Sequence, residues 1–298
     1  MRIAQFFLRT YFRLLSAVAP DLAAKKAALL FQRAQKRKLR APERVFYAEH
    51  SAQFLSYRGA ELPIFEWGNP NAPLILLVHG WNSNAGSMSG IGNRLVAEGY
   101  RVIAMDLPGH GLSEARHTNL LEMQRAMQAL FDTLGDTPFS IVSHSFGSAV
   151  SSFALAESGV KADKLIFLTS PNRMEAVFED YQQLIGLGKK AFTKLLNIVG
   201  HILRRPIQEA TVTNFLKHAE YTSLLLIHDR SDKVIPFDYA VDIYANTERT
   251  RYLPIEQTGH YRMLWVEDVI DMVADELAGN LAPRYGNASL DYRNKRQH

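Results

Sequence analysis

The chain has 298 residues, no cysteine, and 34 lysine and arginine residues against 30 aspartate and glutamate residues. A hydrophobic fraction of 47% and a charged fraction of 21% exclude a disordered chain, a collagen-like repeat and a disulfide scaffold. The lack of cysteine also excludes a cysteine nucleophile and a thiolate metal site. No run of about 18 apolar residues occurs, so the sequence predicts no transmembrane helix.

The positive charge is concentrated at the N-terminus. Residues 1–45 carry a net charge of +9 and the rest of the chain carries −5, within an overall charge of +4. A basic arm on a mildly acidic body indicates an anionic partner, either a lipid surface or a nucleic acid. The basic residues of this arm are Arg2, Arg9, Arg13, Lys25, Lys26, Arg33, Lys36, Arg37, Lys38, Arg40 and Arg44.

In a helical projection, the first 18 residues separate into an apolar face and an arginine ridge. This pattern is typical of an interfacial membrane helix, although the same face would also suit docking on the protein's own surface. No nucleic-acid-binding signature accompanies the arm, so we favour an anionic membrane as its partner over nucleic acid. The apolar face contains Ile3, Phe6, Phe7, Tyr11, Leu14, Leu15 and Val18, and the ridge contains Arg2, Arg9 and Arg13.

Two further expectations concern the arm. Residues 21–40 are predicted to form a second, solvated basic helix that ends in the run Lys36-Arg37-Lys38. Arg9 and Arg13 interrupt the apolar stretch that a secretory signal peptide would need, so we expect a cytoplasmic protein that lies peripherally on the inner face of a membrane.

From residue 45 the sequence alternates between short apolar runs and segments of helical length. Residues 45–57 and 62–67 are predicted as antiparallel opening strands, and the apolar run 74–78 as a strand buried on both faces. This alternation predicts an α/β fold with a mostly parallel twisted sheet flanked by helices. Further strands are predicted over 101–105, 139–142, 164–168, 223–227 and 251–253, and helices over 91–98, 119–134, 146–157, 238–244 and 263–277.

The alternation fails once, between Ser170 and Ser223. A helical insertion of this kind after a strand predicts a cap over the edge of the sheet. The expected organisation is a basic helical arm over 1–44, a core over 45–170 and 218–280, a helical cap over 171–217, and a polar tail over 281–298.

The segment Ser143-His144-Ser145-Phe146-Gly147 follows a predicted strand and precedes a predicted helix. A sharp turn in this context lifts a serine above the sheet, and Ser145 is therefore the candidate nucleophile. The usual pattern is G-x-S-x-G, and here Ser143 replaces the first glycine. Upstream, His79-Gly80-Trp81 ends a strand, and the backbone N–H groups of Trp81 and Phe146 are the candidate oxyanion donors.

A serine nucleophile needs a base, which an acid must hold in one tautomer. The strand predicted over 223–227 delivers Asp229 and Asp232 into a loop, and Thr258-Gly259-His260 follows the last strand. Only His260 and the C-terminal His298 follow Asp232, so the order Ser145, Asp232, His260 is the natural one. Asp229 remains the alternative acid.

These segments resemble the α/β-hydrolase superfamily over about residues 45–280. The resemblance implies Ser145 as nucleophile, His260 as general base and acid, Asp232 as the orienting acid, and a cap between the sixth and seventh strands of the fold. Ser143 departs from the superfamily pattern. The matching segments, in the superfamily's order, are His79-Gly80-Trp81, residues 106–113, 143–147 and 232–236, and Gly259-His260.

The sequence therefore predicts a serine hydrolase that cleaves a carboxylic ester through an acyl-enzyme. A thioesterase, lactonase, amidase or C–C bond hydrolase would use the same triad, and a non-catalytic receptor would keep the same fold. No P-loop, H-E-x-x-H motif or dinucleotide fingerprint is present, so we expect no cofactor and no metal. The turn at residues 106–113 is expected to be structural.

Overall fold

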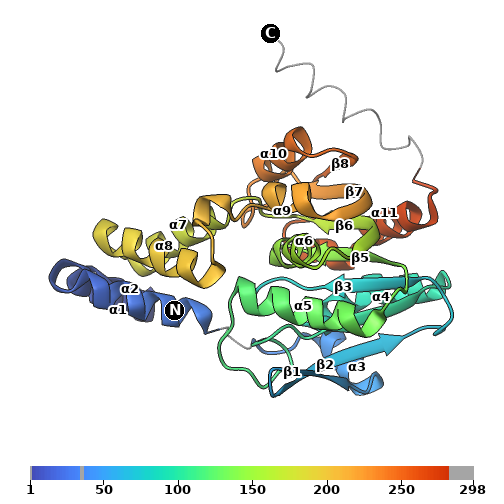
Figure 1. Ribbon diagram of the computed structural model, residues 1–298, viewed down its shortest axis with the longest axis horizontal. Helices are drawn as coiled ribbons and strands as arrows, with labels where there is room; N and C mark the ends of the chain where they lie inside the picture. Colours follow the sequence, from blue (N-terminus) through green and yellow to red (C-terminus); the bar gives the residue numbers. More distant parts are fainter. Residues whose placement is uncertain (1, 34–36, 282–298) are drawn as a thin grey trace, which may run out of the picture.

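The computed structural model describes residues 2–33 and 37–281. Lys36 of the predicted basic run and the tail beyond Leu281 lie outside these residues. An eight-stranded sheet forms the centre (Figure 1), in the order β1-β2-β4-β3-β5-β6-β7-β8. The strands are β1 (Gln53–Tyr57), β2 (Ala60–Trp67), β3 (Leu74–Val78), β4 (Arg101–Met105), β5 (Phe139–His144), β6 (Lys161–Leu168), β7 (Glu220–Asp229) and β8 (Thr250–Ile255).

Strands β3 to β8 are parallel, whereas β1 and β2 are antiparallel at one edge. The prediction of a mostly parallel α/β sheet is therefore confirmed. Every residue of β3 is buried, as its continuous apolar sequence requires. Parallel strands end at the same edge of the sheet, so the loops after β3, β5, β6, β7 and β8 lie together there.

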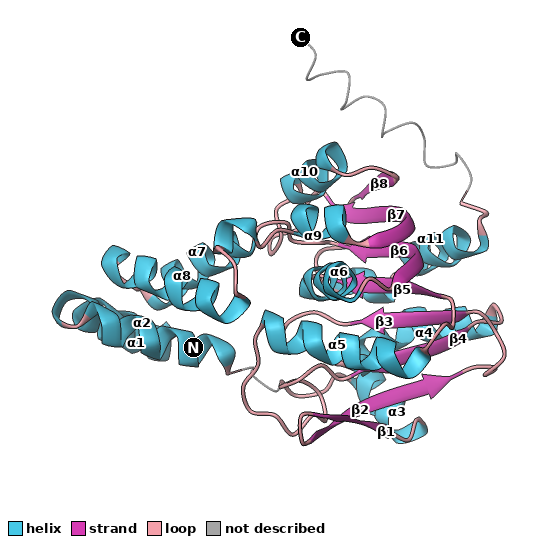
Figure 2. Cartoon of the chain, viewed as in Figure 1, coloured by secondary structure: helices cyan, strands magenta, loops and turns pink. Residues whose placement is uncertain are grey.

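Helices cover both faces of the sheet (Figure 2). Side chains of β3 alternate between two cores, because Leu76 packs with the helices of one face and Leu77 with those of the other. The first core contains α5 (Leu120–Leu134), α6 (Phe146–Ser158) and α10 (Asp238–Asn246). The second contains α3 (Ala41–Glu49), α4 (Ser89–Ala97) and α11 (Glu267–Ala278), with short 3₁₀ helices at Ala85–Met88 and Arg262–Trp265.

A helical insertion separates β6 from β7. It consists of α7 (Met174–Ile185), α8 (Lys189–Leu203), a 3₁₀ turn (Ile207–Glu209) and α9 (Val212–His218). Helix α9 packs on α6 through the stacked rings of Phe153 and Phe215, whose centroids are 4.5 Å apart. Helices α7 and α8 project away from the sheet beside α1 and α2 (Figure 1).

The N-terminal arm consists of α1 (Arg2–Val18) and α2 (Pro20–Gln32), which pack against the helical insertion. The Gly188 N–H donates a hydrogen bond to Ser16 Oγ at 3.0 Å, and the Tyr181 hydroxyl donates one to the Ala27 carbonyl at 2.9 Å. Four alanines of α2 are buried, and their small side chains let α2 and α8 approach closely. No described helix is long and apolar enough to cross a membrane.

The prediction of a fully solvated second arm helix is therefore wrong. The helix ends at Gln32, and its buried face consists of Ala23, Ala24, Ala27 and Ala28. Alanine contributes little to an apolar periodicity, so this face gave only a weak signal in the sequence.

Two other predicted elements need correction. Residues 45–49 belong to α3 and not to an opening strand. The Arg40 N–H donates to the Glu43 carboxylate at 2.7 Å, which caps this helix, and the Phe46 ring packs against Phe65 at 5.1 Å. The helix predicted over 263–277 is divided at Val266 into a 3₁₀ helix and α11.

Candidate active site

Ser145 lies on the turn between β5 and α6. It has a φ of +53°, a value that residues other than glycine rarely adopt. Its N–H donates to the Leu168 carbonyl at 2.9 Å, which helps to hold this conformation. A Cβ atom at Gly147 would lie 2.5 Å from the Val78 carbonyl oxygen, so this position requires glycine. The turn therefore has the strained geometry expected of a nucleophile between a strand and a helix.

His260 follows β8 and its side chain contacts both other predicted triad members. Its Nε2 lies 3.0 Å from Ser145 Oγ, and its Nδ1 lies 2.8 Å from Asp232 Oδ2. Because the ionised carboxylate only accepts, Nδ1 carries the hydrogen, and Nε2 is left to accept the Ser145 hydroxyl proton. The structure thus brings Ser145, His260 and Asp232 together in one hydrogen-bonded chain.

Asp232 lies in the loop after β7, where four groups hold its carboxylate. Its Oδ1 accepts from the N–H groups of Val234 at 2.7 Å and Ile235 at 3.0 Å, while Oδ2 accepts from His260 and from the Thr169 hydroxyl. Burial alone would raise the pKa of Asp232, but the hydrogen bond and charge of His260, with the hydrogen bonds from Thr169 and Ile235, hold this pKa well below its usual range. The carboxylate therefore stays ionised.

Asp229, the alternative acid, contacts different groups. Its carboxylate accepts from the Ser231 N–H at 2.6 Å and the Gly259 N–H at 2.6 Å, and also from Thr258. Burial opposes ionisation, but these hydrogen bonds lower the pKa of Asp229 to about 2. Asp229 thus joins the Asp232 loop to the loop that carries His260, while Asp232 makes the contact with the imidazole.

The segment that carries Trp81 lies against Ser145. A Cβ atom at Gly80 would be 3.0 Å from Ser145 Cβ. His79 fixes this segment, because its Nδ1–H donates to the Gly80 carbonyl at 2.8 Å and its Nε2 accepts the Leu107 N–H at 3.1 Å. Burial, with nearby His110, lowers the pKa of His79 well below its usual value. The other predicted oxyanion donor is the N–H of Phe146, the first residue of α6, which has no acceptor within its own helix.

The chain is similar to known hydrolases in sequence and in fold. A family model described as the alpha/beta hydrolase fold matches residues 73–191. The chain belongs to the α/β-hydrolase superfamily. Human serine hydrolase-like protein 2 is 26% identical over 230 residues, which cover 72% of this chain and 65% of that protein. Human serine hydrolase-like protein is 34% identical over 113 residues, 35% of this chain and 53% of the relative.

The chain thus matches about half to two thirds of the length of these two relatives. Among solved structures, a thioesterase domain from the curacin biosynthetic pathway aligns with a TM-score of 0.60 and 17% identity, over 77% of this chain and 99% of that domain. A membrane phospholipase A aligns with a TM-score of 0.61 and 16% identity, over 94% of this chain and 99% of the phospholipase chain. The structures show that the fold is shared, and together the comparisons support a hydrolase of this superfamily.

An apolar cavity of this α/β hydrolase lies beside Phe146. It is narrow, and almost all of its lining is apolar. Three parts of the chain line it, with Phe146 from the core, Phe178 from the helical insertion and Phe31 from the arm. The Trp81 ring lies 5.1 Å from Phe31 and 5.3 Å from Phe146, so aromatic contacts join the arm to the site.

Sequence reasoning missed two side chains that touch the triad. The His144 Nε2–H donates to the His260 carbonyl at 2.8 Å, and the Thr169 hydroxyl donates to Asp232. Burial, with a contribution from His260, lowers the pKa of His144 to about 3, so this imidazole is neutral. His144 was visible inside the motif around Ser145. Thr169 could have been sought only as the residue after β6, at the edge where the parallel strands end.

Two other positions explain features of the sequence. Ser143, which stands where the pattern has glycine, is buried, and its hydroxyl lies 2.7 Å from that of Ser151. The carboxylate of Asp106 accepts from the Tyr47 hydroxyl at 2.8 Å, the Ala85 N–H at 2.8 Å and the Leu112 N–H at 2.7 Å, which is a structural arrangement.

His228, near Asp232, does not form a cluster with it of the kind that binds metal. Its Nε2 lies 3.2 Å from Thr169 Oγ1 and 3.0 Å from the Ile235 carbonyl oxygen. Within residues 2–33 and 37–281, no group of three or more histidine, aspartate or glutamate side chains is placed to hold a metal ion.

Proposed function

We propose that the chain is a serine hydrolase that cleaves carboxylic esters through an acyl-enzyme intermediate. One observation carries this proposal. Ser145 Oγ, His260 and Asp232 form a continuous chain of hydrogen bonds, with distances of 3.0 and 2.8 Å. These hydrogen bonds have the geometry by which a base activates a serine and an acid orients the base.

In the first half of the reaction, Ser145 Oγ attacks the carbonyl carbon of the ester while His260 Nε2 takes the hydroxyl proton. Asp232 remains ionised and keeps its hydrogen bond to Nδ1–H, which stabilises the imidazolium that forms. His260 then gives the proton to the departing alcohol oxygen, and the acyl group stays on Ser145. In the second half, His260 takes a proton from water and the hydroxide attacks the acyl carbonyl. His260 then returns this proton to Ser145 Oγ as the bond to the acyl group breaks and the acid is released.

The negative charge on the carbonyl oxygen needs donors that are already in place. We assign this role to the N–H groups of Trp81 and Phe146. The close approach of Gly80 to Ser145 Cβ supports the first assignment. The position of Phe146 at the start of α6 supports the second, because N–H groups at a helix N-terminus favour an anion.

The cavity beside Phe146 supports an apolar acyl group in the substrate. Its lining includes Leu120, Phe178 and Leu203, and a hydrocarbon chain would remove this surface from water. The helical insertion would then act as a cap over the acyl chain. A thioesterase domain and a membrane phospholipase A share the fold.

The test is hydrolysis of p-nitrophenyl esters from acetate to palmitate. Replacing Ser145 by alanine is expected to lower kcat/KM by about 10⁴-fold or more, because the nucleophile is lost. The matched control is Ser158→Ala at the end of the same helix, which is expected to keep the activity of the wild type. Retained hydrolysis by folded Ser145→Ala would refute the proposed mechanism.

A further inference from the structure

Helix α1 has two opposite faces with different surroundings. Phe12 and Ser16 are buried on the face that packs against the helical insertion. In a helical projection, the opposite face carries a row of large hydrophobic side chains that are 45–82% exposed. This row, the outer face of α1, consists of Ile3, Phe6, Phe7, Tyr11, Leu14 and Val18.

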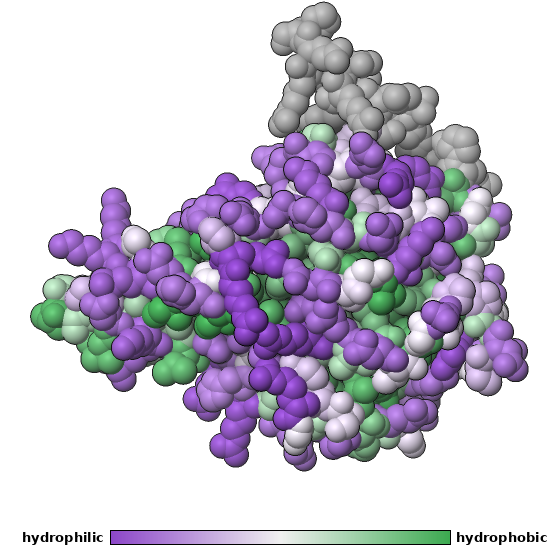
Figure 3. Space-filling model, viewed as in Figure 1, coloured by the Kyte–Doolittle hydropathy of each residue, from purple (hydrophilic) through white to green (hydrophobic). Residues whose placement is uncertain are grey.

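The exposed hydrophobic residues are concentrated in the arm. Among the described residues, eight of the fourteen large hydrophobic side chains that are exposed belong to α1 and α2, namely the outer face together with Leu22 and Leu29. Figure 3 shows hydrophobic surface gathered over these two helices, at the end of the molecule away from the sheet. Folded soluble proteins rarely expose a large contiguous apolar patch unless it binds something.

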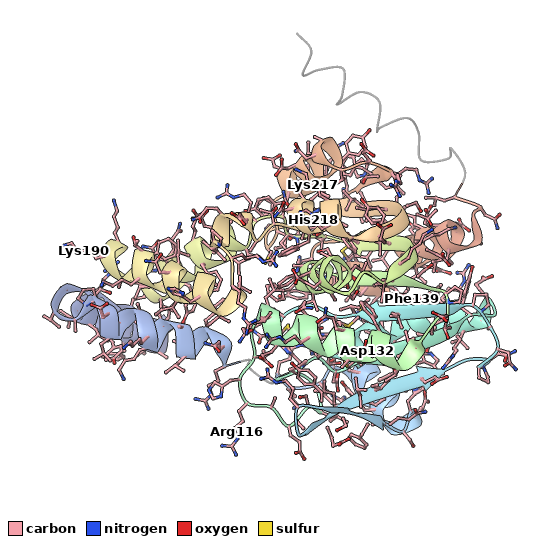
Figure 4. All side chains as sticks on the ribbon, in the orientation of Figure 1. Arg116, Asp132, Phe139, Lys190, Lys217 and His218 are labelled. Carbon is pink, nitrogen blue, oxygen red and sulfur yellow. The ribbon has the colours of Figure 1, made fainter. Side chains whose placement is uncertain are left out.

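Exposed basic residues of the arm indicate what binds there. Lys25 and Lys26 are exposed on α2, and Arg33 is exposed directly after it. Lys189 and Lys190 are exposed at the start of the neighbouring α8, where Lys190 points away from the arm (Figure 4). The one acid of the described arm, Asp21, is paired with Lys194. A positively charged apolar surface complements anionic lipid headgroups and acyl chains, whereas it would repel a second copy of itself.

We propose that the arm binds the surface of an anionic lipid bilayer through the outer face of α1 and the basic side chains beside it. The apolar side chains enter the region between headgroups and acyl chains, and the lysines and arginines contact the headgroups.

The same arm forms one wall of the cavity beside Phe146. On α2, Leu29 is 61% exposed, whereas Phe31, two residues later, lines the cavity and packs on Phe178 with ring centroids 4.4 Å apart. An arm on the bilayer therefore places the cavity next to the lipid, so that acyl esters reach Ser145 from the membrane. This second part of the inference rests on the proposed function.

Co-sedimentation with vesicles tests binding without any need for catalysis. The protein is mixed either with vesicles of phosphatidylcholine alone or with vesicles that contain phosphatidylcholine and anionic phosphatidylglycerol in equal amounts. The Ser145→Ala variant is expected to bind to these vesicles as the wild type does. Phe6→Ser is expected to lower partition into the anionic vesicles about tenfold, because a phenylalanine side chain no longer leaves water. The matched control is Phe54→Ser on β1, since Phe6 and Phe54 are 65% and 63% exposed.

A second pair of variants tests whether binding to anionic vesicles depends on the basic side chains of the arm. Lys26→Glu is expected to weaken binding to the anionic vesicles several-fold, and Lys217→Glu on α9, far from the arm in Figure 4, is expected to leave it unchanged. Equal binding of the wild type to both kinds of vesicle would overturn the proposal, as would equal effects of Phe6→Ser and Phe54→Ser.

Two further measurements separate the remaining explanations. If sedimentation velocity shows a wild-type dimer that Phe6→Ser converts to a monomer, and the wild type does not bind vesicles, the outer face is an interface between copies and the proposal is wrong.

The Phe6→Ser variant is expected to hydrolyse a dissolved short-chain ester at a rate within twofold of the wild-type rate. It is expected to lose activity on a long-chain ester carried in anionic vesicles. Equal losses on both esters would contradict the role of the arm in substrate delivery.

Discussion

His144 and His260 are joined by a hydrogen bond from the Nε2–H of the first to the backbone carbonyl of the second, over 2.8 Å. The two imidazole rings also pack together, with centroids 4.9 Å apart. His144 is therefore placed to fix the backbone of the loop that presents His260 to Ser145. It acts through His260 and is a positioning residue.

Replacing His144 by alanine removes this hydrogen bond and leaves the His260 carbonyl without its donor. We expect kcat on a p-nitrophenyl ester to fall about tenfold with little change in KM, because about 1.4 kcal/mol of positioning is lost. His144→Gln, whose Nε2 also donates, is expected to restore most of the activity. A general loss of structure would instead change KM and thermal stability, and glutamine would not rescue it.

Asp232→Asn tests the orienting role of the acid. The N–H groups of Val234 and Ile235 hold Oδ1, so the asparagine amide nitrogen would take the position of Oδ2 and face His260 Nδ1. The imidazole would then carry its hydrogen on Nε2 and could not accept the Ser145 proton. We expect kcat to fall by about 10³- to 10⁴-fold, as in other triads, with the thermal stability of the variant monitored alongside. A fall of less than tenfold would disprove this role.

The lowered pKa of Asp229 predicts that the free energy of unfolding depends on pH. Its folded-state pKa of about 2 is below the value near 4 of an unfolded chain, so its contribution is present above pH 4 and disappears as the pH falls towards 2. We expect Asp229→Asn to lower the free energy of unfolding in urea by about 2 kcal/mol at pH 7, and by less at pH 3. Exposed Asp132 on α5 (Figure 4) supplies the control, Asp132→Asn, which should change little. An equal loss at both pH values would contradict this account.

Phe31→Ala tests whether the arm forms a wall of the acyl cavity. The cavity is narrow, and removing this ring would widen it between α2 and α7. We expect the best p-nitrophenyl ester to become longer by two or more carbons. We also expect stability to fall by about 2 kcal/mol, because a half-buried ring is lost. Phe54→Ala, on the exposed side of β1, should leave the chain-length preference unchanged. If Phe31→Ala and the wild type prefer the same ester chain length, the arm does not form a wall of the acyl cavity.

Much of the fold could be predicted from the sequence, because each parallel strand is a short apolar run with a helix-length segment after it. The candidate site could be predicted from its order in the chain, since Ser145 sits between a strand and a helix and only two histidines follow Asp232. The choice between Asp229 and Asp232 could not be made in this way. Asp229 is the last residue of β7 and Asp232 lies three residues further along the chain, so only the folded loop shows which carboxylate faces His260.

The N-terminal third shows why other features escaped prediction. The run Val45-Phe46-Tyr47 has the β-branched and aromatic composition of a strand, but the cap by Glu43 and the burial of Phe46 place it in a helix. The contact of α2 with the rest of the protein depends on alanines and on Phe31, whose partners Trp81, Phe178 and Tyr181 lie far away in the sequence. Such contacts between distant segments leave no local pattern.

The central claim is that Ser145 is an activated nucleophile, and labelling with a fluorophosphonate tests it most directly. The wild type is expected to gain the mass of one phosphonyl group, located by peptide mapping on Ser145. The Ser145→Ala variant is expected to gain none, and Asp232→Asn is expected to react much more slowly. A folded wild type that stays unlabelled, or a label on another residue, would contradict the account.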